Sequence, residues 1–292
     1  ELMVASVDTS MCRVESVRVV SSLLQSMAFK KDQIILLELT PEGICFTTED
    51  SKCVQAKALL KRELFGQYQF RSQDRLLCFS VGLSHLLDCL SLYGSASADI
   101  TSLHMCFPGT DNTLVILLTE GEGDRAVVTD CRLRTNMPFE PMHVVLSPSR
   151  GETILQSALL REALSELDWC AGSSTLSFLP ATQQQSRDGT EDPVAGECRV
   201  VLTGEGPYGV VEVTIPESAD GLNSISVDKE THVHYKLSHL LLNKKALSFS
   251  EDTQLKVDDQ GTMSLMHMIP GSEKDQFVCL TLTIQAQDDP DL

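Results

Sequence analysis

A glycine-rich turn is the first pattern in this sequence that could do chemistry. Residues 204–209 (GEGPYG) match the G-x-G-x-x-G spacing of phosphate-binding loops. The match lies between two predicted strands and opens no predicted helix, and Pro207 stands where a phosphate loop needs a backbone N–H. We therefore interpret it as a hairpin turn.

Histidines form the second pattern. His232 and His234 are two residues apart, which puts both imidazoles on one face of a strand, and His239 follows close behind. Imidazole is a good ligand for transition metals. The sequence offers no clear carboxylate or thiol to join them, so we expect surface or packing histidines and no metal site.

Acidic pairs form the third pattern. Glu49-Asp50 and Asp258-Asp259 lie at predicted turns. A two-metal nuclease needs carboxylates from separate elements that converge on ions about 4 Å apart, and acidic turns alone do not establish this. The sequence also has no G-x-S-x-G elbow and no P-loop. We expect no catalytic residue and no cofactor.

Composition limits the class of protein. The 292 residues carry a net charge of −18, and 42% are hydrophobic, which is enough for a packed core. No apolar run reaches the roughly 18 residues of a membrane span, and the first residues lack a secretion-signal pattern. None of the 10 cysteines forms a C-x-x-C pair, so we expect reduced, structural thiols in an intracellular protein. An acidic surface repels phosphate, so we expect no tight binding of bare DNA by the chain alone.

Periodicity predicts an α+β fold, because single helices stand among many short strands that favour antiparallel sheets. Apolar residues at helical spacing predict helices over residues 13–28, 83–93, 152–167 and 236–243. Predicted strands cover residues 34–39, 43–48, 54–60, 76–81, 103–107, 114–119, 126–133, 175–179, 199–203, 209–215, 256–257, 263–269 and 277–284.

The predicted helices begin about every 70 residues once a polar, loop-like stretch at 181–196 is left out, which indicates an internal repeat. The string LSHLL occurs at both 83–87 and 237–241, on two of these helices. A proline-rich stretch at 134–148 favours an extended connector. We therefore predict two similar domains of two helices each, at 1–133 and 149–285, followed by an acidic tail at 286–292.

Several strings carry a resemblance to a known family: 52–56 (KCVQA), 86–91 (LLDCLS) with 93–95 (YGS), 160–168 (LREALSELD) and 235–247. In this order and spacing the chain resembles the sliding DNA clamps of the proliferating cell nuclear antigen family. Within that family it is similar to Rad-one-type subunits of the heterotrimeric DNA-damage checkpoint clamp, the nine-one-one complex. Residues 61–65 and 167–169 look most similar to plant or algal versions.

The resemblance implies a DNA-clamp fold and an arc-shaped subunit of a ring whose inner wall is made of helices. It implies two partner subunits, of the Rad-nine and Hus-one types, and an ATP-dependent clamp loader. Double-stranded DNA would pass through the ring, and repair and checkpoint proteins would dock on it in the nucleus, with no membrane involved. Three alternatives stay open: a homotrimeric replicative processivity clamp, a metal-dependent 3′→5′ exonuclease, and a protein-interaction domain without DNA.

By position, the resemblance implies cationic residues that face the DNA. These candidates are Arg13, Arg18, Arg161, Lys236, Lys244 and Lys245 on the predicted helices, with Lys30 and Lys31 at a helix end. Asp88, Glu162 and Glu166 fall near such positions too, and acids there depart from the family pattern. An alternative is that all of these cations are ordinary solvated side chains.

Clamps of this family join head to tail through edge strands, which strand order places near 125–133 and 209–215. An internal strand is the alternative at both places. The subunit-interface candidates are Arg125, Val127, Thr129, Cys131, Leu133, Gly209, Val211, Val213 and Ile215. Partner peptides dock beside the connector in this family, where Leu39, Met137, Phe139, Val144 and Leu146 could line a groove or simply pack in the core.

Overall fold

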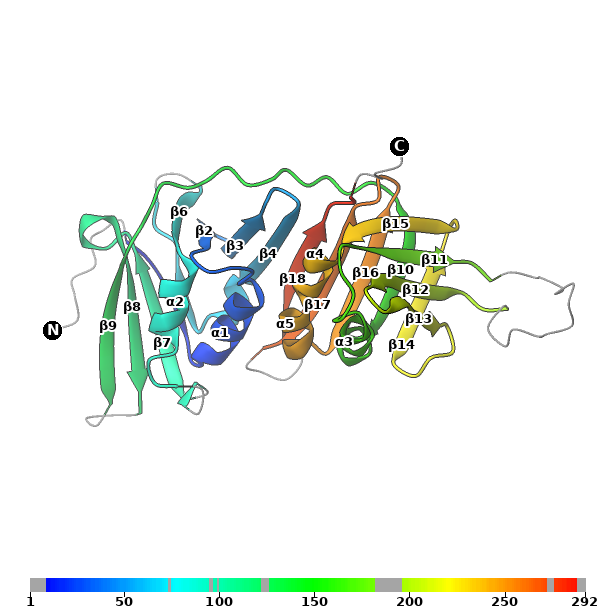
Figure 1. Cartoon of the computed structure of the whole chain (residues 1–292). Coiled ribbons are helices and arrows are strands. Elements are labelled where there is room, and N and C mark those ends of the chain that lie inside the picture. The colour runs from blue at the N-terminus through cyan, green and yellow to red at the C-terminus, as the bar shows by residue number, and fades with distance from the viewer. Residues whose placement is uncertain are drawn as a thin grey trace, which may run out of the picture. The chain divides into compact units, whose positions relative to one another are not determined.

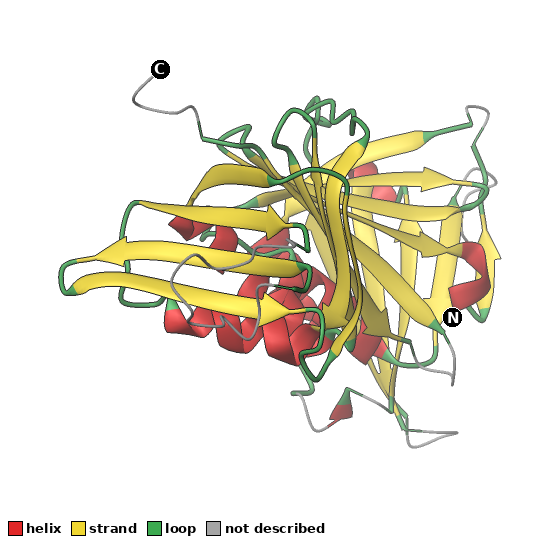
Figure 2. Cartoon of the chain, turned by 90° about the vertical axis from the view of Figure 1, so that its right-hand side faces the viewer, coloured by secondary structure: helices red, strands yellow, loops and turns green. Residues whose placement is uncertain are grey.

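The structure is a computed structural model that describes residues 9–72, 75–94, 97–98, 100–121, 126–181, 196–271 and 276–287. Short helices alternate with many antiparallel strands, so the predicted α+β class is confirmed (Figures 1 and 2). Within these residues, no helix is both long and apolar enough to cross a membrane. The chain divides into two compact units: residues 1–49, 56–142 and 269–280 form the first, and 50–55, 143–268 and 281–292 form the second.

The first unit contains two helices that pack on each other, α1 (Val17–Ser26) and α2 (Leu83–Leu90). One sheet of this unit has the strand order β5-β1-β7-β8-β9. A second run of hydrogen-bonded strands has the order β4-β3-β2-β6. Short 3₁₀ turns are η1 (Arg62–Leu64) and η3 (Thr110–Asn112). The strands are β1 (Ser10–Val14), β2 (Ile34–Thr40), β3 (Gly43–Asp50), β4 (Val54–Lys61), β5 (Gln67–Gln69), β6 (Leu77–Gly82), β7 (Thr101–Phe107), β8 (Thr113–Glu120) and β9 (Val127–Arg134).

The second unit contains α3 (Ser157–Glu166), α4 (Leu237–Leu241) and α5 (Asn243–Phe249), and α3 packs on α5. One run of strands has the order β14-β10-β16-β17-β18, and a separate four-stranded sheet has the order β13-β12-β11-β15. The strands are β10 (Ser149–Gln156), β11 (Ser173–Leu179), β12 (Arg199–Gly206), β13 (Gly209–Pro216), β14 (Leu222–Val227), β15 (Thr231–Lys236), β16 (Asp252–Asp258), β17 (Met263–Pro270) and β18 (Phe277–Ile284).

Two predicted helices begin too early. Residues 10–14 form strand β1, in which Cys12 and Val14 are buried while Arg13 is exposed, and α1 begins only at Val17. The side chain of Ser16 caps α1 by accepting a hydrogen bond from the N–H of Arg18 at 3.3 Å. Residues 152–156 likewise belong to β10, and α3 begins at Ser157. In both places an apolar residue of the strand falls at a spacing that also fits the helix after it.

The fourth predicted helix, 236–243, is two helices. α4 ends at Leu241, and α5 continues from Asn243 to Phe249 through Leu242, whose backbone is still helical (φ −59°, ψ −25°). Strands β1, β5, β10, β14 and β15 were not among the predicted strands. The predicted loop at 181–196 and the predicted tail at 286–292 lie mostly outside the described residues.

A chain of buried polar side chains fixes the helices of the second unit. Ser157 at the start of α3 shares a 2.8 Å hydrogen bond with Thr253 on β16, and Thr253 shares one of 2.9 Å with Nδ1 of His267 on β17. His267 Nε2 lies 3.2 Å from Oδ1 of Asn243, the first residue of α5. Because the Asn243 amide nitrogen donates to the Leu240 carbonyl, its oxygen is the atom left to accept from His267. His267 therefore carries a proton on Nε2, and burial lowers its pKa to about 3, so the ring is neutral near pH 7.

Candidate nucleic-acid and subunit interfaces

Both strands that could join neighbouring subunits are sheet edges. β9 pairs only with β8, and β13 only with β12, among the described strands (Figure 1). Neither is an internal strand of its sheet. The outer backbone groups of such an edge are available to a strand of another chain.

The candidate interface residues follow these two edges. Val127 is exposed and Thr129, Cys131 and Leu133 are half-buried on β9; Gly209 is exposed, Val211 and Val213 are half-buried and Ile215 is buried on β13. Arg125 lies outside the described residues. Val128 and Val210, which the sequence did not single out, are 60% and 65% exposed, so each edge begins with an uncovered valine.

A tyrosine at the end of α2 supports the β9 edge. The Tyr93 hydroxyl lies 2.6 Å from Oγ1 of Thr129 and donates to the Val127 carbonyl at 3.4 Å. These bonds fix the first half of β9 against the helical layer of its own unit. These bonds add to the pairing of β9 with β8 and hold the edge strand in place while its other side is open to a strand of another chain.

The hairpin between β12 and β13 is the glycine-rich turn of the sequence, since Gly206 pairs with Gly209 across it. The hairpin interpretation is confirmed. Trp169, just after α3, lies against this turn: a Cβ on Gly206 would be 2.7 Å from the indole ring. Trp169 and Tyr208 have ring centroids 6.4 Å apart, and Tyr208 is 89% exposed. The β13 edge therefore starts beside two accessible aromatic rings.

The cationic candidates occupy different kinds of element. Arg18 lies on α1, Arg161 on α3, and Lys244 and Lys245 on α5; Lys30 and Lys31 follow α1 in a loop. Arg13 and Lys236 are not on helices, contrary to the prediction, because Arg13 lies on β1 and Lys236 ends β15. All are exposed except Lys244, which is half-buried.

Acidic side chains accompany these cations. Lys244 Nζ lies 2.7 and 2.8 Å from the two carboxylate oxygens of Asp168, and Arg13 pairs with Glu15 at 3.3 Å. Glu162 and Glu166 are exposed on α3, as Asp88 is on α2. The helical surfaces thus carry both signs of charge, and a phosphate backbone near them would meet few unopposed cations.

The connector candidates belong to two units of the chain. In the first unit Leu39 is buried beside Phe79 and Phe107, whereas Met137 is 87% exposed and Phe139 is half-buried. In the second unit Val144 is half-buried and Leu146 is 48% exposed. The connector attaches to β6 through a bridge of two hydrogen bonds: the Ser80 N–H donates to the Asn136 carbonyl at 3.1 Å, and the Asn136 N–H donates to the Ser80 carbonyl at 2.7 Å.

The acidic turn at Asp258 is structural. Its carboxylate accepts hydrogen bonds from the N–H groups of Gln260 at 3.0 Å, Thr262 at 2.7 Å and Ser147 at 3.1 Å.

No three His, Cys, Asp or Glu side chains are grouped closely enough to hold a metal ion in the part of the chain that the structure describes.

A family model described as "Repair protein Rad1/Rec1/Rad17" matches residues 11–269. The chain belongs to the Rad1 family. It is 31% identical to the mouse (Mus musculus) cell cycle checkpoint protein RAD1, over 88% of this chain and 85% of the mouse protein. It is 30% identical to the human protein of the same name, over 88% of this chain and 84% of that protein.

The fold of this Rad1-family chain is that of the sliding clamps. A crystal structure of Proliferating Cellular Nuclear Antigen from Entamoeba histolytica matches with a TM-score of 0.73 at 14% identity, covering 95% of this chain and 98% of that one. The predicted clamp fold and the predicted relationship to checkpoint subunits are both confirmed. The plant or algal origin stays a prediction.

Sequence reasoning on this Rad1-family chain missed Trp169 and Tyr208 as neighbours of an edge. A signal for them was present, because Trp169 is the one tryptophan of the sequence and Tyr208 lies in the hairpin turn. Large aromatic side chains in accessible positions are enriched at protein interfaces. Their proximity depends on the turn packing against the end of α3, which no local pattern predicts.

Proposed function

We propose that this Rad1-family chain is a non-catalytic subunit of a heterotrimeric checkpoint sliding clamp that encircles DNA at damage sites. It would serve there as a platform for checkpoint signalling and repair proteins. The observation that carries the proposal is the pair of sheet edges, β9 and β13, in a chain with the clamp fold. A ring closed head to tail needs two different edges on each subunit, and this chain has them.

The two edges differ in chemistry. β9 carries Asp130, Arg132 and Arg134, whereas β13 carries Glu212 as its one charged residue and begins beside Trp169. Each edge would therefore select its own neighbour, by strand pairing supported by side-chain contacts. We assign these neighbours to the Rad-nine-type and Hus-one-type subunits, in line with the family.

DNA would be held mainly by enclosure. Arg18, Arg161 and Lys245 are exposed on helices and are proposed to touch phosphates. Lys30 and Lys31, in the loop after α1, are proposed to do the same. A phosphate contact by Lys244 would be weaker, because Lys244 is already paired with Asp168. Enclosure removes the need for many ionic contacts, because escape requires opening a subunit interface. Loading would need a separate ATP-driven loader, and work on chromosomal DNA would place the complex in the nucleus.

The exposed connector residues Met137 and Leu146 are proposed as contacts for partner peptides, with Phe139 and Val144 beside them in the sequence. Exposed apolar side chains on an extended segment can receive a short apolar motif. Leu39 is buried, so it is not accessible for direct contact with a peptide.

Co-expression tests the proposal. The chain should be monomeric or aggregation-prone alone, and should form a 1:1:1 complex with one Rad-nine-type and one Hus-one-type subunit, measured by size-exclusion chromatography with light scattering. A stable homotrimer of the chain alone would instead favour a replicative clamp.

A further inference from the structure

Two exposed aromatic side chains lie together at the start of the β13 edge. Trp169 is 39% exposed, and Tyr208, in the turn between β12 and β13, is 89% exposed; their ring centroids are 6.4 Å apart. Val210, the second residue of β13, is 65% exposed. Large apolar side chains that a chain leaves uncovered next to one another are typical of a surface that another molecule covers.

The fold holds Trp169 at this place. The ring lies against Gly206, where a Cβ would be 2.7 Å from the indole, so only glycine lets the ring approach the hairpin. Two residues further on, the Ala171 N–H donates to the Glu205 carbonyl of β12 at 2.9 Å, which ties the turn after α3 to the hairpin. Trp169 therefore has its position before any partner arrives, and little side-chain freedom is lost on binding.

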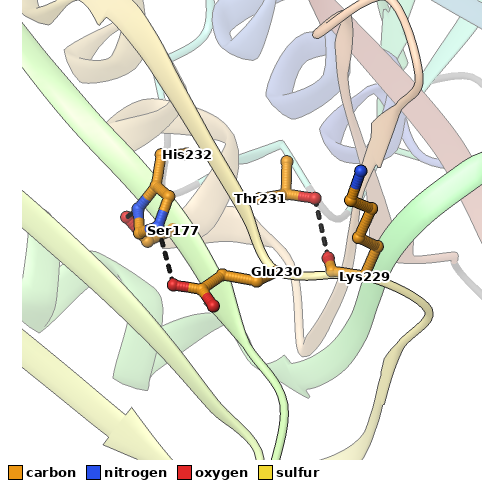
Figure 3. Close-up of polar contacts among 5 residues, drawn as sticks. All are labelled: Ser177, Lys229, Glu230, Thr231 and His232. Carbon is orange, nitrogen blue, oxygen red and sulfur yellow. Dashed lines mark hydrogen bonds and ion pairs between the residues drawn. The ribbon is translucent and has the colours of Figure 1, made fainter.

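The opposite edge of the same sheet, β15, is partly covered by the chain itself. The His234 carbonyl accepts a hydrogen bond from the Gln287 N–H at 2.8 Å. Beside it, Nε2 of His232 lies 3.1 Å from Oε1 of Glu230, and Nδ1 lies 2.8 Å from the Ser177 hydroxyl of β11 (Figure 3). These polar groups have partners within the chain. Among the described strands, β13 is thus the edge of this sheet that is open to another molecule.

Exposed carboxylates flank the aromatic pair. Glu166 ends α3, and Glu205 and Glu212 lie on the two strands of the hairpin; all three are exposed. Asp168 is already paired with Lys244, so it adds little net charge here. A cationic side chain from a partner would meet these carboxylates and the faces of two aromatic rings. Arginine suits such a surface, because its planar guanidinium stacks on aromatic faces and pairs with carboxylates.

We propose that Trp169 and Tyr208 anchor the subunit interface at β13 by receiving an arginine side chain of the neighbouring subunit. The inference rests on the proposed function, which brings an edge strand of another subunit against β13. The guanidinium lies on the aromatic rings and pairs with the flanking carboxylates, while the two strands hydrogen-bond through their backbones. Strand pairing tolerates many sequences because it uses backbone groups, so the aromatic anchor supplies the preference for one neighbour over the other.

Tyr208→Ala tests the anchor, because Tyr208 is almost fully exposed and its loss leaves the fold intact. The chain is mixed with each of the two partner subunits in turn, and binding is measured by native mass spectrometry. Binding to one partner should weaken about 10-fold or more, as for a central interface residue, and binding to the other should not change. Tyr208→Phe keeps the ring and should bind both partners as the wild type does.

Two further variants sharpen this test. Trp169→Leu keeps an apolar side chain but removes the aromatic face, so it should weaken binding to the same partner as Tyr208→Ala does; thermal unfolding checks that it is folded. Phe277→Ala is the matched control, because it removes an exposed aromatic ring from β18, away from the β13 edge, and should leave both affinities unchanged.

A double-mutant cycle identifies the arginine. Each exposed arginine on the edge strand of the affected partner is replaced by methionine, which keeps an extended side chain and removes the charge. For the arginine that meets the anchor, the loss of affinity should be similar to that of Tyr208→Ala, and the two changes together should cost much less than their sum.

Failure of this inference is distinct from failure of the proposed function. If the wild-type chain forms no heterotrimer, the proposed function is wrong and the anchor falls with it. If the heterotrimer forms, and both Tyr208→Ala and folded Trp169→Leu bind the two partners as the wild type does, the anchor alone is wrong. If these variants weaken binding but no partner arginine is coupled to Tyr208, the assignment of a guanidinium to this surface is overturned.

Discussion

At the scale of single residues, His267 is a histidine whose pKa is strongly lowered by burial. It is fully enclosed between Thr253 and Asn243, and both ring nitrogens are used as a neutral imidazole uses them. A second proton, on Nδ1, would place a positive charge in a fully buried site and would require the Thr253 hydroxyl to accept a hydrogen bond instead of donating one. The neutral ring is therefore part of the packing of α3 and α5 on β16 and β17.

The pH dependence of stability follows from this. The pKa of His267 is about 3 in the folded chain, below the usual value of about 6.5 in the unfolded chain, so the unfolded state binds the proton first as pH falls. The contribution of His267 to stability is present above about pH 6.5 and is lost progressively as the pH falls from there toward 3, by an amount on the order of 2 kcal/mol at pH 5. Urea unfolding between pH 7.5 and 5 measures this change. Burial also lowers the pKa values of His104 and His239, which add to it in the same direction.

Variants separate His267 from the other histidines. His267→Gln keeps an amide that can hydrogen-bond but does not titrate, so the variant should be less stable at pH 7.5 and should lose less stability toward pH 5. His143→Ala, at an exposed site, should keep the wild-type slope. An unchanged slope in His267→Gln would contradict the assignment.

Gly151 gives a second prediction at this scale. A Cβ there would lie 2.3 Å from the ring of Phe178, which is completely buried and has no room to move. We expect Gly151→Ala to lower the free energy of unfolding by about 1–3 kcal/mol, the usual cost of overpacking. Gly196→Ala is the matched control, because nothing lies within 4 Å of its added Cβ. Thermal unfolding followed by circular dichroism compares the two.

At the scale of elements, sequence patterns predicted strands better than helix boundaries. The start of α2 at Leu83 agrees with the prediction, because Leu83, Leu86 and Leu90 are buried on one face and a glycine precedes them. The start of α3 does not agree, because Thr153 and Leu155 alternate as buried residues of a strand, yet Leu155 also falls at helical spacing with Leu159. Asn243, the first residue of α5, bonds to His267, which lies 24 residues further along the chain. Such a long-range contact leaves no local pattern.

The candidate sites also divide into features that local sequence patterns predict and features that depend on contacts between distant parts of the chain. Periodicity and order were enough to predict β9 and β13, since both are short β-branched strands bounded by turns. Arg13 was placed on a helix because Val14 and Val17 have helical spacing, although the strand alternation of Cys12, Arg13 and Val14 prevails. The hydrogen bonds from β11 to His232 and His234 require the sheet register, which the sequence does not reveal.

An edge-strand variant gives the prediction at this scale. Val210 is 65% exposed at the start of β13, where a partner strand would pair. Val210→Lys puts a charge at the edge, which opposes strand addition and leaves the internal sheet intact. We expect normal thermal stability and at least 10-fold weaker assembly with the two partner subunits, measured by native mass spectrometry.

Val145→Lys is the matched control for this variant. Val145 is 70% exposed and lies on the connector rather than on a sheet edge. Its variant should assemble as the wild type does. If Val145→Lys impaired assembly and Val210→Lys did not, the proposed role of β13 would be wrong.

At the scale of the whole molecule, the net charge of −18 conflicts with a simple DNA-binding role. A protein that holds DNA by 6–10 phosphate contacts loses about 10³–10⁵ in affinity between 50 and 200 mM salt. This chain has a few exposed helical cations with acids beside them, so it cannot rely on such contacts. Enclosure by a ring answers the conflict, because retention then depends on closed interfaces.

Retention on circular DNA tests this directly. Once loaded onto a nicked plasmid, the complex should stay bound through a 500 mM salt wash, a concentration chosen to remove ionic binders, and should leave when the plasmid is cut to a linear form, as followed by gel filtration.

Arg18→Glu with Lys245→Glu should reduce loading, since these exposed side chains are proposed to touch phosphates, yet complexes that do load should still resist salt. Arg75→Glu, at an exposed arginine outside the helices, is the control and should load normally. Loss of the wild-type complex in salt while the plasmid is still circular would mean that ionic contacts hold the DNA, and the enclosure model would then fail even if the heterotrimer forms.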